Sequence, residues 1–330
     1  MKKIRFINVN RFIIIHVENH ENGEMVMSMR TKATILLVVV NFFWGLSYIF
    51  MKMGIASIEP FNLVALRCLI AFIIAATFFY RSLRHVNIEL LFYSFLLGFL
   101  LLLVFSLVTV GLTMTDASNA GFLLSMTVIF VPVIQSILQR KLPIVPVRIG
   151  IIITFVGIII MTITHSLSFN YGDILCMLSA LAYAIQILII GRVTKDHEPI
   201  TVGIMQLGFA GILALVLSSF FESPILPQNT VAWMSILGLA ILCSAFGFIS
   251  QAVAQKHTSP TQTSLMFSLE PLFAAGLAVI ILGEAFTIRD IIGAFLIICG
   301  VIVATLGSYR VPVKVKTEQT MEQKTEKILL

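Results

Sequence analysis

The sequence has few charged residues: Asp, Glu, Lys and Arg make up 12% of its 330 positions. Soluble domains carry about 25% charged and about 45–50% apolar residues. Here the apolar types reach 58% and the mean hydropathy is +1.02. So few charges cannot cover the surface of a water-soluble protein of this length. The composition therefore excludes an ordinary soluble domain and indicates an integral membrane protein.

Cysteine is also scarce, and the common catalytic motifs are missing. The four cysteines lie inside apolar runs with no CxxC or Cys/His spacing, which argues against a disulfide framework or a metal site. No GxSxG, HExxH or GxxxxGK[ST] pattern occurs. We therefore expect no cofactor, no ATP hydrolysis and no enzyme, with a membrane-embedded enzyme or a sensor as the alternative.

The net charge of +6 would suit a nucleic-acid partner, but the charges are spread between apolar runs instead of forming one patch. The expected surroundings are therefore a lipid bilayer, not nucleic acid.

Long apolar runs are the most prominent feature of the sequence. A helix needs about 20 apolar residues to cross the hydrocarbon core. Ten such runs occur, at 33–53, 61–80, 90–112, 117–138, 147–165, 172–191, 200–221, 231–254, 261–282 and 290–309. Short polar or Pro-containing gaps separate them, so consecutive helices are expected to form antiparallel hairpins. The predicted fold class is an all-α integral membrane protein with ten transmembrane helices.

The positive charges predict how these helices are oriented. Ten spans place nineteen of the 22 Lys and Arg residues on one side and only Lys52, Arg67 and Arg289 on the other. Because Lys and Arg concentrate in cytoplasmic loops, both termini are predicted to be cytoplasmic. Residues 1–32 then form a cytoplasmic tail, either disordered over its first 29 residues or with translation really starting at Met29. Residues 310–330 form a disordered cytoplasmic tail.

The chain contains a weak internal repeat at an offset of 139–143 residues. Pro60 to Arg67 matches Pro199 to Gln206, Gly98 matches Gly238, and Thr115 to Lys141 runs beside Thr258 to Glu284. These matches keep the same order over five predicted helices. Since five is odd, the second unit would enter the bilayer from the opposite side. The sequence thus predicts two inverted five-helix repeats, 33–165 and 172–309, as in many secondary transporters, with one half rocking against the other.

Four segments carry a resemblance to a known family: NFFWGLSYIFMKMG (41–54), PFNLVALRCLIA (60–71), TDASNAGFLLSMTVIFVP (115–132) and HTSPTQTSLMFSLEPLFAAGLAVIILGE (257–284). With them the chain resembles EamA-type permeases of the drug/metabolite transporter superfamily, which have two tandem EamA domains. The resemblance implies a small-molecule transporter of the cytoplasmic membrane. In the first half, Thr127 and Val128 stand where the second half has Glu270 and Pro271, so the two halves need not contribute equally.

Glu270 is the acidic residue nearest the centre of any predicted span. A carboxylate at that depth costs several kcal/mol unless it faces a cavity, finds partners or is protonated. Pro271 removes a backbone N–H beside it and weakens the helix, which creates either a hinge or a free carbonyl for substrate. Glu270 is therefore a candidate for substrate binding or proton coupling. The alternative is a protonated residue that only holds neighbouring helices together.

Other polar and aromatic residues within the spans are weaker candidates. Arg67 could attract an anionic group, pair with Glu270 or reach the headgroups, and Lys52 fits an interface anchor. Trp44 and Tyr183 are repeat-related and could line the substrate path or simply pack. Asn41, Gln206, Gln186 and Gln251 could line it too, or join helices by hydrogen bonds. Glycines at 150, 157, 293 and 300 predict close helix packing, as scaffold or in a homodimer.

The function expected from these features is alternating-access transport of a small metabolite or drug-like molecule. Efflux, coupled to protons through Glu270, is the favoured form. A phosphorylated-metabolite or nucleotide-sugar antiporter of the same superfamily is the alternative. It would need several cations facing the cavity to hold phosphates, whereas the spans offer Arg67 and Lys52.

Overall fold

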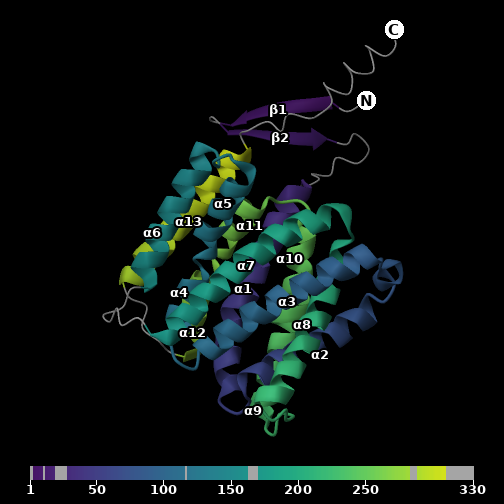
Figure 1. Cartoon of the computed structure of the whole chain (residues 1–330). Helices are drawn as coiled ribbons and strands as arrows, with labels where there is room; N and C mark the ends of the chain where they lie inside the picture. Colours follow the sequence, from purple (N-terminus) through teal and green to yellow (C-terminus); the bar gives the residue numbers. More distant parts are fainter. Residues whose placement is uncertain are drawn as a thin grey trace.

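The computed structural model describes residues 3–9, 12–18, 28–115, 117–162, 170–282 and 288–309, and the part predicted to lie in the membrane is a bundle of helices (Figure 1). The first half contains α1 (Met29–Ile55), α2 (Pro60–Phe78), η1 (Ser82–His85), α3 (Ile88–Gly111), α4 (Ala117–Leu124), α5 (Thr127–Gln139) and α6 (Val145–Thr162). The second half contains α7 (Tyr171–Asp196), α8 (Pro199–Phe221), α9 (Thr230–Gly238), η2 (Leu239–Phe246), α10 (Gly247–Gln255), α11 (Pro260–Phe267), α12 (Glu270–Leu282) and α13 (Ile288–Tyr309).

Each of the ten predicted apolar runs coincides with helix in the part of the chain that the structure describes. Within the described residues, eight helical segments are long and apolar enough to cross a membrane, and α6 contributes a shorter apolar helix, Val145–Ile160. The remaining run, α11 with α12, is divided at Ser268 and Leu269 into two shorter helices. The protein is thus a multi-pass, helical membrane protein.

The N-terminal segment differs from the expected disordered tail. Strands β1 (Lys3–Val9) and β2 (Phe12–Glu18) pair antiparallel, with Val9 opposite Phe12 and Lys3 opposite Glu18. Both strands are rich in Ile, Val and Phe, the residue types that favour extended backbone. The predicted C-terminal tail, 310–330, lies outside the described residues.

Two helices are broken at the same position of the repeat. The chain passes through a tight turn at Ser125–Met126 between α4 and α5, and at Ser268–Leu269 between α11 and α12. The Ser125 hydroxyl donates to the Gly121 carbonyl, and that of Ser268 to the Leu265 carbonyl. In the second half the break comes just before Pro271, where Pro was expected to weaken the helix. Thr127 and Glu270 each become the first residue of the following helix segment.

The π-helix η2 is a further irregularity, found in the second half alone among the described residues. Gly98 and Thr115 are 17 residues apart in the first half, whereas their counterparts Gly238 and Thr258 are 20 apart. A π-helix has more residues per turn than an α-helix and so takes up part of this insertion. The sequence prediction of a regular helix over 231–254 missed this feature.

The most extensive helix contacts run between the two halves rather than within them. Helix α6 packs along α13, α2 along α8, and α3 against α7 and α8. In the repeat, α1 corresponds to α7, α2 to α8, and α3 to η2 with α10. The contact of α3 with α7 therefore corresponds to that of α10 with α1, and the contact of α3 with α8 corresponds to that of η2 with α2. The start of α1 and the end of α13 lie at the same end of the bundle (Figure 1). The two halves are therefore intertwined and similarly arranged.

Candidate functional site

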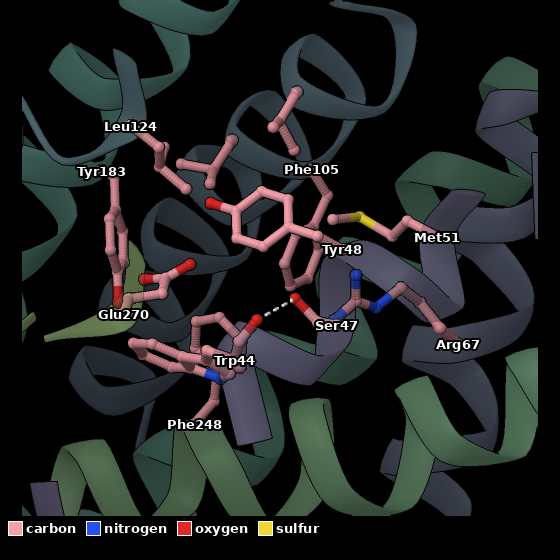
Figure 2. Close-up of a pocket in the computed structure, with 12 residues that line it drawn as sticks. Trp44, Ser47, Tyr48, Met51, Arg67, Phe105, Leu124, Tyr183, Phe248 and Glu270 are labelled. Carbon is pink, nitrogen blue, oxygen red and sulfur yellow. Dashed lines mark hydrogen bonds between the residues drawn. The ribbon is translucent and has the colours of Figure 1, made fainter. Parts of the chain in front are cut away.

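A small cavity lies between the two halves. Its walls come from α1, α2, α3 and α4 of the first half and from α7, α10 and the start of α12 in the second (Figure 2). The centre of a water molecule can occupy about 40 Å³ of it, which is room for about three waters at roughly 10–15 Å³ each. The lining residues are Trp44, Ser47, Tyr48, Met51, Arg67, Val104, Phe105, Val108, Leu124, Tyr183, Phe248 and Glu270.

One end of the cavity is acidic and hydroxylated. Glu270 is 8% exposed, and it lies within electrostatic reach of the phenol groups of Tyr48 and Tyr183. Among the described residues, the Tyr183 phenol oxygen has no hydrogen-bond partner within 3.5 Å, and the Tyr48 phenol has the Glu270 carboxyl as its polar neighbour. A buried polar group without a partner costs free energy, which a bound molecule, a water or a proton can recover. This end therefore has unused capacity to bind a polar group.

The other end holds a cation. Arg67 is 2% exposed, its Nε donates to the Ser244 Oγ at 3.0 Å, and its guanidinium carbon lies 4.0 Å from the centre of the Phe105 ring. In the described ranges no ion pair within 4.0 Å joins Arg67 to Glu270. Arg67 is thus held inside the bundle: it neither pairs with Glu270 nor extends to the surface.

Aromatic side chains form the wall between these ends. Trp44 donates its indole N–H to the Cys243 carbonyl at 2.9 Å, a contact that η2 provides. The Trp44 ring lies 6.0 Å from the Tyr183 ring and 5.1 Å from the Phe248 ring, centre to centre. Because its polar atom is already satisfied, Trp44 presents a fixed apolar surface. The structure places the repeat-related residues Trp44 and Tyr183 side by side in this wall.

The remaining candidates lie outside the cavity lining. Asn41 is buried and donates to the Leu37 carbonyl of its own helix at 2.6 Å. Gln206 accepts from Gln186 at 2.9 Å in a buried cluster that also contains Gln251 and Gln255. Pro271 is buried next to Glu270 but does not line the cavity, and Lys52 is exposed.

Sequence reasoning missed the polar lining residues Ser47 and Tyr48. It also missed Phe105, which packs on Arg67, and Phe248, which packs on Trp44. Tyr48 could have been found, because it follows Trp44 by four residues and therefore lies on the same face of the helix. The two Phe residues could not be singled out among the 26 in the chain.

A multi-pass helical protein built from two similar halves, around a small and mostly apolar cavity that holds a few polar groups, is the class that fold and site define. The profile of the EamA-like transporter family matches residues 31–163 and 170–306, so the chain belongs to that family and contains two EamA domains. This is a transporter family, not an enzyme family. The chain is therefore a membrane transporter.

Relatives of similar length agree with this assignment. An "uncharacterized transporter" of Archaeoglobus fulgidus is 28% identical over 297 residues, covering 86% of this chain and 100% of the relative. The uncharacterized transporter YoaV of Bacillus subtilis is 23% identical, covering 83% of this chain and 97% of the relative. A solved crystal structure matches with a TM-score of 0.71 and 16% identity over 85% of this chain and 99% of that one. At this identity the structural likeness shows a shared fold alone.

Proposed function

We propose that the protein exports a small metabolite or drug-like molecule by alternating access and that protons entering the cell drive the export. In this proposal ten helical spans form two inverted five-helix repeats, both termini are cytoplasmic, and the protein resides in the cytoplasmic membrane. The excess of Lys and Arg on one side of the ten spans supports the orientation. The contacts that map onto each other when the halves are exchanged support the inverted repeat.

The observation that carries the proposal is a small cavity, formed by both halves, with a carboxyl group at the start of a broken helix. Secondary transporters place substrate between their repeats, beside discontinuous helices. A cavity with room for about three waters must widen before a metabolite can enter.

Glu270 is the proton-coupling residue in this proposal. A carboxyl inside the membrane is expensive when charged, so it binds and releases protons as its surroundings change between the two sides. Its neighbours Tyr48 and Tyr183 can donate hydrogen bonds to the charged form and accept one from the protonated form.

The rival antiporter of phosphorylated metabolites has less support. Among the described lining residues, Arg67 is the one with a cationic side chain. The other candidate, Lys52, is exposed and lies outside the cavity. A phosphate with two negative charges is usually held by more than one cation.

The test compares the concentrations of metabolites inside cells and in the medium. The strains are a deletion strain and strains that overexpress the wild-type chain, the Glu270→Gln variant or, as a control, the Glu59→Gln variant. Glu59 lies at the exposed start of α2 and makes no side-chain cap bond. We expect a compound that is retained in the deletion strain and exported by wild type and Glu59→Gln. Glu270→Gln should lose concentrative export and its pH dependence but keep exchange of labelled for unlabelled compound. A well-expressed Glu270→Gln with full pH-dependent flux would refute the coupling role.

A further inference from the structure

Arg67 is a buried cation whose partners leave its charge uncompensated. One hydrogen bond from Nε to Ser244 and a face-on contact with Phe105 fix the orientation of the guanidinium. Figure 2 shows the group pointing into the pocket, toward Tyr48 and Ser47. In the described part of the chain, no ion pair within 4.0 Å involves Arg67.

Such an arrangement is costly for a protein that binds nothing there. Taking an ion out of water costs several kcal/mol after relaxation, and a serine hydroxyl with an aromatic face returns only part of it. At the repeat-related position, the second half has the uncharged Gln206, which is bonded to Gln186. A buried position of this kind can therefore be filled without a charge, which points to a specific use for Arg67.

We infer that Arg67 binds a single carboxylate group of the transported molecule, and that this molecule is small and dipolar. The planar guanidinium matches the two oxygens of a carboxylate, and Nε is already committed to Ser244, which leaves the terminal amino groups for the ligand. One guanidinium balances one negative charge. This inference deepens the proposed function and rests on it.

The opposite end of the cavity determines what the rest of the molecule carries. Glu270, Tyr48 and Tyr183 offer oxygen acceptors, so they suit an ammonium or hydroxyl donor and repel a second anionic group. The aromatic wall between the two ends, with Trp44 and Phe248, suits an apolar middle portion. A molecule with a carboxylate, a short apolar body and a donor group therefore matches the order of the groups along the cavity, which must widen to hold it.

Vesicles that contain the full chain test this directly. The probes are amino acids, which are small dipolar monocarboxylates, and their carboxamides, which lack only the anionic charge. Glucose 6-phosphate and glucose serve as the doubly charged and the uncharged probe. The variants are Arg67→Gln, Arg67→Lys and Ser244→Ala, with Lys52→Gln as the matched control for an exposed cation outside the cavity.

We expect wild type and Lys52→Gln to transport at least one amino acid and to transport its amide at least tenfold more slowly. Arg67→Gln should slow the acid by about 10- to 100-fold, the range for losing a hydrogen-bonded charge pair, and leave the amide unchanged. A variant that is simply misfolded would transport neither the acid nor the amide. If Arg67→Gln does not reach the membrane, Arg67→Lys should still prefer acid over amide, at a reduced rate, and Ser244→Ala should weaken the preference.

Two kinds of result overturn the inference. Equal rates for acid and amide, or a preference for glucose or glucose 6-phosphate, would show that Arg67 does not select a monocarboxylate. The same conclusion would follow if cells, in the metabolite comparison above, exported a compound without a carboxylate while the vesicles transported no acid probe. Absence of flux for every compound in both assays contradicts the proposed transport function itself, and the inference falls with it.

Discussion

At the scale of single residues, charged side chains serve two different purposes, and burial separates them. Glu270 and Arg67 line the cavity, whereas Glu222 lies at the end of α8 and binds the start of α2. Its two carboxylate oxygens accept from the backbone N–H groups of Phe61 at 2.9 Å and Asn62 at 2.8 Å. Because the first N–H groups of a helix have no partner within it, this carboxylate acts as a cap supplied by another helix.

Removing this cap should destabilise the protein without affecting the cavity. We expect Glu222→Ala to lower the free energy of unfolding by about 1–2 kcal/mol, the range for lost capping bonds. Glu59→Ala is the matched control, since Glu59 occupies the N-cap position of the same helix but makes no side-chain cap bond. Thermal unfolding of the purified variants in detergent measures both. Equal melting temperatures for the two variants would show that the capping bonds contribute nothing measurable.

At the scale of elements, glycines determine how closely α6 and α13 approach. A Cβ at Gly157 would lie 2.8 Å from the Gly293 carbonyl oxygen and 2.8 Å from the Ile297 amide nitrogen. Those are backbone atoms, which cannot rotate away as a side-chain tip can. The same holds for Gly150 and Gly300, so these glycine faces are used within one chain. The sequence left scaffold packing and a homodimer open, and the contacts favour the scaffold.

The glycine prediction follows from this geometry. Gly157→Ala should push the two helices apart and cost about 1–3 kcal/mol, as overpacking does. Gly276→Ala in α12 should be neutral or slightly stabilising, because nothing lies within 4 Å of its Cβ position and alanine favours a helix over glycine by about 0.5–1 kcal/mol. The readout is again the melting temperature in detergent. A Gly157→Ala variant as stable as Gly276→Ala would contradict the close packing inferred for α6 and α13.

Element positions were predictable from the sequence, but their irregularities were only partly so. Apolar runs and their polar separators, such as Asn170–Asp173, place the helices because lipid requires a continuous apolar stretch of fixed minimum length. The Asn170 and Asp173 side chains indeed form a capping box at the start of α7. Pro271 indicated the break before α12, whereas the break at Ser125–Met126 has no adjacent proline. Only the repeat alignment, which places Thr127 opposite Glu270, could have revealed that break.

At the scale of the whole molecule, the candidate site was predictable in part for a similar reason. Glu270 and Arg67 stand out because charges are rare in membrane spans. Which face each side chain occupies depends on how ten helices pack, and a single sequence does not contain that information. Asn41 and Gln206 were therefore chosen on polarity alone, and both are buried among helices instead.

The packing of the whole bundle also suggests which parts move. The sequence predicted that one half rocks against the other, but α6 with α13 and α2 with α8 form the most extensive interfaces, and both join the two halves. Rocking one half as a rigid body would break both interfaces. Segments that meet beside the cavity are better candidates. Helices α5 and α11, each next to a helix break, contact each other, and the Thr261 hydroxyl donates to the Gln135 side-chain oxygen at 2.6 Å.

A crosslinking experiment distinguishes these two movements. In a chain whose native cysteines are replaced by alanine, Gln135→Cys with Thr261→Cys would join α5 to α11, and Ser82→Cys with Thr201→Cys would join η1, which follows α2, to α8. The second pair is the control, because the Thr201 hydroxyl already donates to the Ser82 carbonyl at 2.9 Å and ties η1 to α8. Mass spectrometry of linked peptides verifies each crosslink, and export is measured before and after reduction.

If α5 and α11 separate to admit substrate from the cytoplasm, crosslinking the first pair stops export and reduction restores it. The second pair should leave export within about twofold of the reduced protein, because α2 and α8 move together. Rocking of whole halves predicts that the control crosslink also blocks export, since a bond between η1 of the first half and α8 of the second would prevent any movement of one half against the other. Full export by the crosslinked first pair would show that the cavity opens elsewhere. Inhibition by both crosslinks would indicate that each five-helix half moves as one rigid unit.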